Sequence, residues 1–372
     1  MKWHHKEHEY DEYWHKIENI KSVYLYGAGL VGKSVLHVLD GYLDILGFID
    51  SDHSKIHTYI EGIYVYSLSE VHLDDTSTIL ITVSPDNVED VIKHTSEYNF
   101  RSEDMHVFLP VMFNYRYNKL LLTSVSYLPT TVCNLKCRYC LNFSPYLKHK
   151  EFRDIDKLKH DIDVFFSQID NVLLFHVSGG EPFLYPQIDE LLHYISDNYV
   201  DRIERLETTT NGTVLPGDKL CNTLSELNVG VTLDDYREAV PQFNETFDKI
   251  IAKFDHYNLN YRIQKVDKWI DLRSSNNVNL SEHYLKNHFD RCNVPWQEYR
   301  NGFLYLCNYS DYAAVADLYT VHDDERLNIS NASKKEIMEF RLGYSDKGYV
   351  DFCRHCAGYY NNNNYVTPAE QC

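Results

Sequence analysis

Basic residues are scarce in this 372-residue chain: 36 Lys and Arg stand against 55 Asp and Glu, which leaves a formal net charge of −19. Nucleic acids are bound through a basic face, and anionic lipids attract polybasic segments. The charge balance therefore argues against both as partners. Long apolar runs are also absent, so the sequence predicts no segment that spans a bilayer.

An apolar signal-peptide core is absent too, because the first 21 residues are charged and rich in His. Nine cysteines without such a signal indicate a reducing compartment, where clustered thiolates bind metal more often than they form disulfides. We therefore expect a cytoplasmic protein. Its composition, 44% hydrophobic and 24% charged residues, is that of an ordinary globular chain long enough for two or three domains.

A glycine-rich stretch follows the short apolar strand expected at 23–26. Gly27, Gly29 and Gly32 match the dinucleotide fingerprint G-x-G-x-x-G, while Gly27, Gly32 and the following Lys33-Ser34 match the phosphate loop of nucleotide hydrolases. Both motifs place backbone N–H groups at the N-terminus of a helix, where the dipole favours phosphate. The glycines alone leave these two interpretations open.

The next strands favour the first interpretation. The apolar strand at 45–50 ends in Asp50, 18 residues after Gly32, as a ribose-binding acid requires. A phosphate-loop enzyme needs a magnesium-binding acid on a later strand, and the strand at 79–83 ends instead in Ser84-Pro85. We expect a ligand such as a nucleotide, a nucleotide-sugar or NAD, with an empty, vestigial site as the alternative.

The stretch G-F-I-D-S-D, followed by E-G-I-Y-V-Y, resembles the small Rossmann-like domain at the N-terminus of some sugar acyltransferases and polysaccharide-biosynthesis proteins. With an amphipathic helix expected over 1–20, this resemblance implies a Rossmann-like α/β domain over 21–118. Its last strand is expected at 105–109, and 110–118 is expected to be a linker.

Strand–loop–helix units then repeat over 119–285, which indicates right-handed crossovers and a parallel sheet. Polar motifs follow the expected strands: C-x3-C-x2-C after 120–132, S-G-G-E-P after 171–177, T-N-G after 203–210 and Asp234-Asp235 after 229–233. Functional residues at the carboxyl ends of strands are typical of a TIM-like barrel. Five or six units are too few for eight, so the sequence predicts an open, partial (β/α)6 barrel.

The cysteine triplet is Cys133, Cys137 and Cys140. Three thiolates are one ligand short of a closed structural zinc site, whereas a 4Fe–4S cluster held by three cysteines keeps one iron open. Taken alone, the spacing leaves zinc, a cluster and chance as alternatives.

The ordered set of motifs resembles the radical S-adenosylmethionine (radical SAM) superfamily. The resemblance implies that the triplet binds a 4Fe–4S cluster whose open iron is chelated by the amino and carboxylate groups of S-adenosylmethionine. It implies further contacts to this cofactor from Tyr139, Gly179, Gly180, Glu181, Pro182, Thr210, Asn211, Thr232 and Asp234.

A second cysteine group follows: Cys292 and Cys307 in the pattern C-x9-G-x4-C, and Cys353 and Cys356 as a C-x2-C pair. Four cysteines suit one zinc ion. The pattern is also similar to the auxiliary-cluster domains of the radical SAM superfamily, which implies a small iron–sulfur domain over 286–372. Asn362 and Val366 replace two cysteines of the two-cluster SPASM form, so the single-cluster twitch form is expected, with a second 4Fe–4S cluster for electron transfer.

The resemblance implies an enzyme that makes a 5′-deoxyadenosyl radical with electrons from a flavodoxin or ferredoxin. The expected substrate is a small polar molecule such as a sugar or nucleotide-sugar, undergoing oxidation, epimerisation or dehydration. A peptide-modifying maturase and a non-catalytic iron–sulfur or zinc protein are the alternatives. Cys221 and Cys372 are candidate hydrogen donors, against a buried structural thiol and a frayed terminus.

Overall fold

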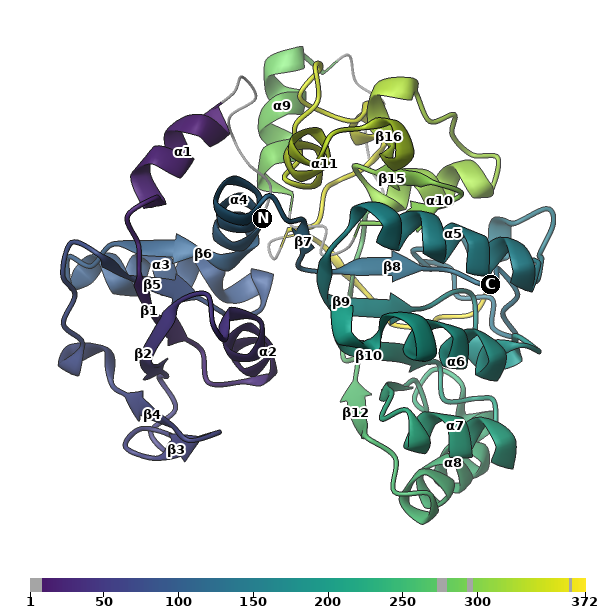
Figure 1. Ribbon diagram of the computed structural model, residues 1–372. Coiled ribbons are helices and arrows are strands. Elements are labelled where there is room, and N and C mark those ends of the chain that lie inside the picture. Colours follow the sequence, from purple (N-terminus) through teal and green to yellow (C-terminus); the bar gives the residue numbers. More distant parts are fainter. Residues whose placement is uncertain (1–8, 273–279, 293–296, 361–362) are drawn as a thin grey trace.

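The computed structural model describes residues 9–272, 280–292, 297–360 and 363–372. Two parallel sheets lie side by side, and the C-terminal segments pack against the second sheet (Figure 1). Residues 1–8 of the expected N-terminal helix lie outside the described residues, and helix α1 covers Glu9–Ile17. Among the described residues, no helix has both the length and the apolar character needed to cross a membrane.

The first sheet has the strand order β3-β4-β2-β1-β5-β6 and is parallel except for the β3–β4 hairpin. Its strands are β1 Ser22–Tyr26, β2 Asp44–Ile49, β3 Tyr59–Ile60, β4 Ile63–Tyr66, β5 Ser77–Ile81 and β6 Ser102–Asp104. Helices α2 (Leu30–Leu39) and α3 (Val88–Glu97) follow β1 and β5.

Helices cover both faces of this sheet. Val23 and Leu25 of β1 belong to the core that includes α2, whereas Tyr26 belongs to the core beneath α3. Alternate residues of a strand point to opposite faces, and apolar side chains on both sides make β1 a central, two-sided strand. In such sheets, ligands bind at the carboxyl ends of the strands.

Helix α4 spans Met105–Tyr117 and replaces two expected elements, so the strand predicted at 105–109 and the linker predicted at 110–118 are both wrong. Asp104 caps this helix by accepting a hydrogen bond from the N–H of His106 at 2.9 Å. Met105–Phe113 is a nearly continuous apolar run packed on several sides, against the first sheet, α1 and α11. Periodicity does not separate a buried helix from a buried strand in such a run.

The second sheet has the order β12-β11-β10-β9-β7, with β8 also paired to β9, and all of these pairs are parallel. This is the open, partial barrel expected from the sequence. The elements are β7 Leu121–Leu122, β8 Val125–Tyr127, α5 Ile155–Gln168, β9 Asn171–Val177, α6 Ile188–Tyr199, β10 Ile203–Thr210, α7 Asp218–Glu226, β11 Gly230–Asp235, α8 Asn244–His256 and β12 Tyr261–Lys265.

The strand expected over 120–132 is two short strands, β7 and β8, which pair with successive parts of β9. Thr123 and Ser124 interrupt them and accept hydrogen bonds from the guanidinium of Arg341 at 2.8 and 3.4 Å. The contact with Arg341 of the distant helix α11 therefore lies at the break in what the apolar pattern predicts to be one strand.

The C-terminal part covers the β8 edge of the barrel, where Ser126 forms a parallel bridge with Glu298. Helix α9 contains residues 285 and 286, between which the domain boundary is expected from the sequence. The elements are β13 Trp269–Ile270, α9 Glu282–Arg291, β14 Tyr299–Arg300, β15 Phe303–Tyr305, α10 Asn308–Val315, β16 Arg326–Asn328, α11 Lys334–Arg341 and β17 Tyr365–Val366.

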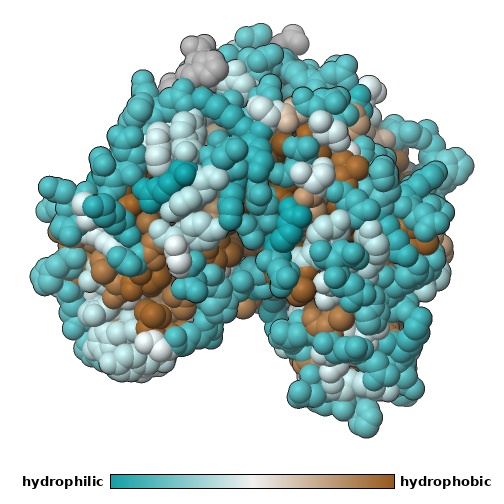
Figure 2. Space-filling model, viewed as in Figure 1, coloured by the Kyte–Doolittle hydropathy of each residue, from teal (hydrophilic) through white to brown (hydrophobic). Residues whose placement is uncertain are grey.

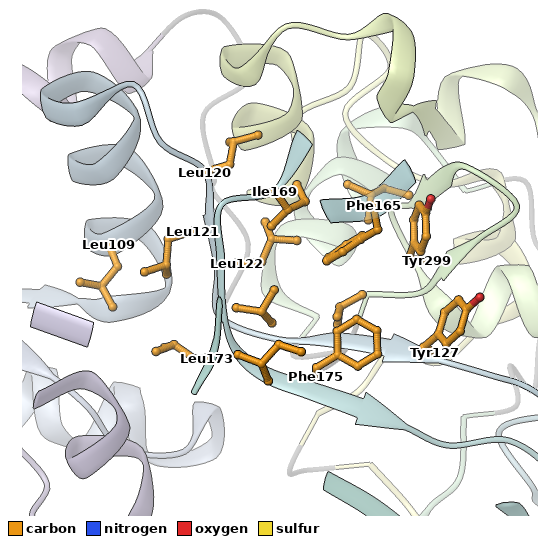
Figure 3. Close-up of a cluster of buried hydrophobic side chains, with 14 of the residues drawn as sticks. Leu109, Leu120, Leu121, Leu122, Tyr127, Phe165, Ile169, Leu173, Phe175 and Tyr299 are labelled. Atoms are coloured by element: carbon orange, nitrogen blue, oxygen red, sulfur yellow. The ribbon is translucent and has the colours of Figure 1, made fainter. Parts of the chain in front are cut away.

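One apolar core joins all three parts of the chain. Figure 3 shows Leu109 of α4, Leu121 of β7, Phe165 of α5, Phe175 of β9 and Tyr299 of β14 in the same cluster. Their side chains are fully buried. Because the three parts share this core, the barrel is held on both flanks by its neighbours.

Candidate active site

The cysteine triplet lies in the loop that follows β8. Cys137 is buried against Leu135, Val240 and Ala369, with Cys133 and Cys140 packed at the edge of the same cluster. Burial, together with the neighbouring Cys140, raises the pKa of the Cys137 thiol to about 12. Burial likewise raises the pKa of Cys133 to about 11. The structure thus brings the three thiols together.

The S-G-G-E-P turn packs directly on this loop. The N–H of Gly180 donates to the carbonyl of Thr130 at 2.9 Å, and that of Glu181 donates to the carbonyl of Val132 at 2.8 Å. A Cβ at Gly180 would stand 2.4 Å from the Val132 carbonyl oxygen. A Cβ at Gly179, whose φ is +146°, would stand 2.7 Å from a backbone oxygen. Two glycines are therefore required for the turn to reach the cysteine loop.

Glu181 links this turn to the end of the next strand. Its Oε1 accepts hydrogen bonds from Thr210 Oγ1 at 2.9 Å and from the N–H of Phe183 at 3.1 Å, and its Oε2 accepts from the N–H of Asn211 at 2.8 Å. The side chain is fully buried, which raises its pKa to about 7. Pro182, also buried, starts the turn that follows.

Asn211 connects strand β10 to the cysteine loop. Its Nδ2 lies 3.7 Å from Cys133 Sγ and donates to Asn134 Oδ1 at 3.1 Å. Asn134 in turn donates to Thr213 Oγ1 at 2.7 Å. These contacts hold the T-N-G segment against the loop, and Asn134 is a participant that the sequence alone did not reveal.

Asp234 and Tyr236 approach the triplet from β11. Burial raises the pKa of Asp234 to about 6, and the Tyr236 hydroxyl donates to its Oδ2 at 2.8 Å. Burial raises the pKa of Tyr236, and negative charge on Asp234, Cys137 and Cys140 adds to the effect. Thr232 is buried in β11, paired with Thr209 and Arg262 on either side. Tyr139 is half-buried beside the last cysteine.

The donor set suits the cofactors expected from the sequence. Within the described ranges, no three His, Cys, Asp or Glu side chains are placed to hold a single metal ion. The ligands of a cluster bind different irons, so they stand further apart than ligands that share one ion. Cys133, Cys137 and Cys140 are the residues that would hold a three-cysteine 4Fe–4S cluster.

The second cysteine group is also brought together. Burial raises the pKa of Cys356, and the neighbouring Cys292, Cys307 and Cys353 contribute to the shift. Backbone N–H groups donate to two of the sulfurs, Tyr359 to Cys292 at 3.2 Å and Gly358 to Cys356 at 3.3 Å. Four such thiols are the ligand set of a second 4Fe–4S cluster.

Of the two positions where the longer SPASM pattern has cysteines, Asn362 lies outside the described residues. Val366 pairs with Trp269 in a short antiparallel ladder.

Three aromatic rings in contact connect the two cysteine groups. Phe143 follows Cys140 by three residues, and its ring centroid lies 4.7 Å from that of Tyr309. Tyr309 in turn lies 5.3 Å from Phe352, which precedes Cys353. Burial raises the pKa of Tyr309, with charge on Cys356, Cys307 and Cys140 among the further causes. The rings come from three separated segments, and no local motif marks them.

The two remaining cysteines lie in different environments. Cys221 is fully buried in α7. Cys372 is exposed, but its N–H donates to the carbonyl of Lys136 at 2.9 Å, so the terminus expected to fray is hydrogen-bonded to the triplet loop.

In the N-terminal sheet, the three motif glycines meet three different physical needs. Gly27 has a φ of +114°, and a Cβ on Gly32 would stand 1.9 Å from the Gly27 carbonyl oxygen. A Cβ on Gly29 would meet nothing within 4 Å. Gly29 instead borders a cavity of about 660 Å³. In a dinucleotide-binding loop, the first glycine allows the tight turn, the second lets the ligand come close to the backbone, and the third lets the helix pack closely.

Asp50 lines the same cavity and is fastened to the loop. Its Oδ2 accepts from the N–H of Ala28 and from Lys55 Nζ, both at 3.0 Å. Burial raises the pKa of Asp50, whereas these hydrogen bonds lower it. The net effect is a lowered pKa. Lys33 lines a different cavity, between α2 and the barrel, and lies 3.7 Å from Glu61. A phosphate-loop Lys would point into the glycine loop, so the position of Lys33 does not support the phosphate-loop interpretation.

Comparison with known proteins shows what the barrel region is similar to. The model of the Radical SAM superfamily matches residues 127–275. GTP 3′,8-cyclase 1 of Mycobacterium tuberculosis is 29% identical over 130 residues, which cover 32% of this chain and 35% of the cyclase. The antilisterial bacteriocin subtilosin biosynthesis protein AlbA of Bacillus subtilis is 30% identical over 112 residues, which cover 29% of this chain and 23% of AlbA.

Among solved structures, native anSMEcpe with bound AdoMet superposes with a TM-score of 0.43 at 17% identity, covering 63% of this chain and 88% of that one. The chain spans about a third or less of the length of the curated relatives named above.

Proposed function

Because residues 127–275 belong to the radical SAM superfamily, we propose that this chain is an enzyme that cleaves S-adenosylmethionine reductively and abstracts hydrogen from a small polar substrate. When bound, the cluster and S-adenosylmethionine supply a 5′-deoxyadenosyl radical. The observation that carries the proposal is the packing of the S-G-G-E-P turn on the loop of Cys133, Cys137 and Cys140, through two backbone hydrogen bonds and two glycines.

The chain's own residues hold and dry this site. The Glu181 carboxylate ties the turn to Thr210 and Asn211, so two strand ends keep a common position relative to the cysteines. The half-buried Asp234–Tyr236 pair borders the thiols on another side. Water exclusion protects a reactive intermediate from side reactions, and the burial of these groups supports that role.

The second cysteine group supports an auxiliary cluster. Four cysteines leave a 4Fe–4S cluster without an open iron, so the role we propose for Cys292, Cys307, Cys353 and Cys356 is to hold a cluster that accepts an electron from the substrate. Electrons for the first cluster would come from a flavodoxin- or ferredoxin-type donor.

The proposed substrate is a sugar or nucleotide-sugar. A cavity of about 880 Å³ opens beside the first site and is lined by Tyr236 together with charged side chains of both signs, among them Arg237, Glu238, Lys265 and Asp267. This volume lies in the range of pockets that bind small molecules. The names of the related GTP 3′,8-cyclases also indicate a nucleotide substrate.

The N-terminal domain supports the same substrate class. Gly29 and Asp50 border a cavity of about 660 Å³ at the carboxyl ends of the strands, where doubly wound sheets bind nucleotides. We propose that this cavity binds the nucleotide moiety of a substrate or a regulatory ligand.

A peptide is the second candidate substrate. AlbA is by its name a biosynthesis protein for a bacteriocin. Strand β12 has four exposed residues, Arg262–Lys265, and within the described residues it pairs on one side only, with β11. An unpaired strand edge can accept an extended peptide.

The first experiment measures 5′-deoxyadenosine released by anaerobically reconstituted protein with S-adenosylmethionine and reductant. We expect release from wild type and from Cys221→Ala, whose thiol is buried in α7, and none from Cys133→Ala. Lack of release from reconstituted wild type would overturn the proposal.

Metal analysis separates the enzyme from a zinc or scaffold protein. Two 4Fe–4S clusters give about eight irons per chain, whereas zinc in the second group gives about four irons and one zinc. Cys353→Ala is expected to lose about four irons and to retain the first cluster.

A substrate panel completes the test. Nucleotides, nucleotide-sugars and unstructured peptides are compared for stimulation of 5′-deoxyadenosine release and for a rise in melting temperature. A response confined to peptides would replace the nucleotide-sugar proposal by the maturase.

A further inference from the structure

Residues 369–372 form a second wall of the cysteine loop, although more than 230 positions separate the two in sequence. The N–H of Arg138 donates to the Glu370 carbonyl at 2.7 Å, and the N–H of Cys372 donates to the Lys136 carbonyl at 2.9 Å. Cys137 and Gln371 are thereby paired as in an antiparallel ladder. The label C in Figure 1 lies beside this end of the barrel.

The Gln371 side chain adds one contact through its oxygen and two through its amide nitrogen. Its Oε1 accepts the N–H of Lys136 at 2.8 Å, and its Nε2 lies 3.4 Å from Cys137 Sγ. Nε2 also donates to the carbonyl of Ala369 at 2.6 Å. The Lys136 N–H needs an acceptor and the Ala369 carbonyl needs a donor, so the Gln371 amide can adopt only one orientation. In that orientation its NH₂ group faces the Cys137 sulfur.

The rest of the segment fixes this placement. Ala369 is fully buried with Leu135, Cys137 and Val240. Arg138 forms an ion pair with Glu370 at 2.9 Å. Just upstream, β17 pairs with β13. Gln371 is therefore held in place by the backbone pairing of its segment with the cysteine loop and by the apolar packing of the nearby Ala369.

From this geometry we infer that Gln371 is a positioning residue for the first cluster, an inference that rests on the proposed function. It holds the cysteine loop through Lys136 and donates a hydrogen bond to the Cys137 sulfur. Reduction adds negative charge to a cluster, so a donor at a ligand sulfur stabilises the reduced form and raises the reduction potential. The wall of residues 369–372 also limits the access of water to Cys137, a second influence on the potential.

Two variants of Gln371 separate the contact of its oxygen from those of its amide nitrogen. Gln371→Glu keeps an acceptor for the Lys136 N–H but has no N–H for the sulfur or for the Ala369 carbonyl. Gln371→Ala loses all three contacts. Gln242→Ala is the matched control, since Gln242 is an exposed glutamine outside this contact.

The first readout is amide hydrogen exchange in the metal-free protein. We expect the Lys136 N–H to exchange about tenfold faster in Gln371→Ala, the loss of one hydrogen bond. Its exchange in Gln371→Glu should stay near wild type. Equal exchange in wild type and Gln371→Ala would overturn the loop-holding part.

The second readout is a potentiometric titration of the reconstituted protein followed by electron paramagnetic resonance. The first cluster should have a more negative midpoint in both Gln371 variants, and most in Gln371→Glu. The second cluster and Gln242→Ala should be unchanged. Unshifted midpoints in both variants would overturn the donor role, whereas the absence of a first-cluster signal in wild type would overturn the proposed function and leave the exchange result to stand by itself.

Discussion

Tyr309 stacks on Phe143 with ring centroids 4.7 Å apart and an interplanar angle of 24°. Phe143 belongs to the segment of the first cysteine group, and Tyr309 follows Cys307 of the second by two residues. The contact with Phe352 completes a path of rings from one group to the other. The two candidate cluster sites are therefore joined by side-chain packing.

Replacing Tyr309 tests this packing. Tyr309→Leu loses two ring pairs, each worth about 0.5–1.5 kcal/mol beyond its buried area, so the free energy of unfolding should fall by about 1–3 kcal/mol. Tyr309→Phe keeps the rings and should stay close to wild type in a urea titration. If Phe and Leu variants were equally stable, the stack would contribute nothing.

Removing the Glu181 carboxylate should disconnect two strand ends. Glu181→Ala leaves the buried N–H groups of Phe183 and Asn211 and the Thr210 hydroxyl without an acceptor, at about 1–3 kcal/mol for each unsatisfied donor. We expect lower stability of the metal-free protein and weaker binding of S-adenosylmethionine by the reconstituted one. Glu226→Gln, on the exposed face of α7, is the control for removal of a carboxylate. Unchanged affinity in a stable Glu181→Ala would contradict the positioning role.

Two glycine variants distinguish ligand approach from packing in the N-terminal domain. The side chain introduced by Gly29→Asp meets open space, so the free energy of unfolding should remain within about 0.5 kcal/mol of wild type. Binding of a nucleotide or nucleotide-sugar should be lost. Gly32→Ala pushes a Cβ into the Gly27 carbonyl and should cost about 1–3 kcal/mol. Calorimetric ligand binding and thermal melting report the two effects. Full ligand binding by Gly29→Asp would exclude this cavity.

His37 makes the contact between the N-terminal domain and the barrel pH-dependent. It lies 2.6 Å from Glu61 and 2.5 Å from Glu204 of β10, one carboxylate at each ring nitrogen. Burial lowers its pKa, but hydrogen bonds to the two carboxylates outweigh burial and raise it overall. His37, Glu61 and Glu204 line one cavity between α2 and the barrel strands. Figure 2 shows a notch between the two lobes of the molecule.

The raised pKa of His37 determines the sign of the effect. The charged form is favoured in the folded protein, so its stabilisation is complete below the unfolded value near 6.5 and is lost as the pH rises through the higher folded value. Because the side chain is half exposed, we expect only about 0.2–1 kcal/mol. Melting temperatures of wild type and His37→Gln should differ at pH 6 and converge at pH 9, whereas His15→Gln should follow wild type throughout. A constant difference between wild type and His37→Gln across this range would contradict the role of protonation.

Most of the candidate site could be predicted from the spacing of residues that lie close together in the sequence. Cys133, Cys137 and Cys140 fall within eight positions, so a single loop brings them together whatever surrounds it. Strand–helix alternation likewise places S-G-G-E-P and T-N-G at neighbouring strand ends of a parallel sheet. The α/β class and the partial barrel followed from the same alternation.

Local spacing was misleading where burial removed the periodic pattern. Helix α4 is apolar on several sides because the first sheet, α1 and α11 surround it, and its sequence does not distinguish it from a strand followed by a linker. The break between β7 and β8 depends on Arg341, more than 200 positions away.

What the sequence by itself determined is the set of candidate ligands and the strand ends that carry candidate site residues, because these depend on neighbours a few residues apart. Only the tertiary structure decided that Gln371 faces Cys137, that Tyr309 stands between the two cysteine groups and that His37 contacts the barrel. Such pairs are set by how distant segments pack to bury apolar surface, and packing over those separations leaves no periodic trace in the chain.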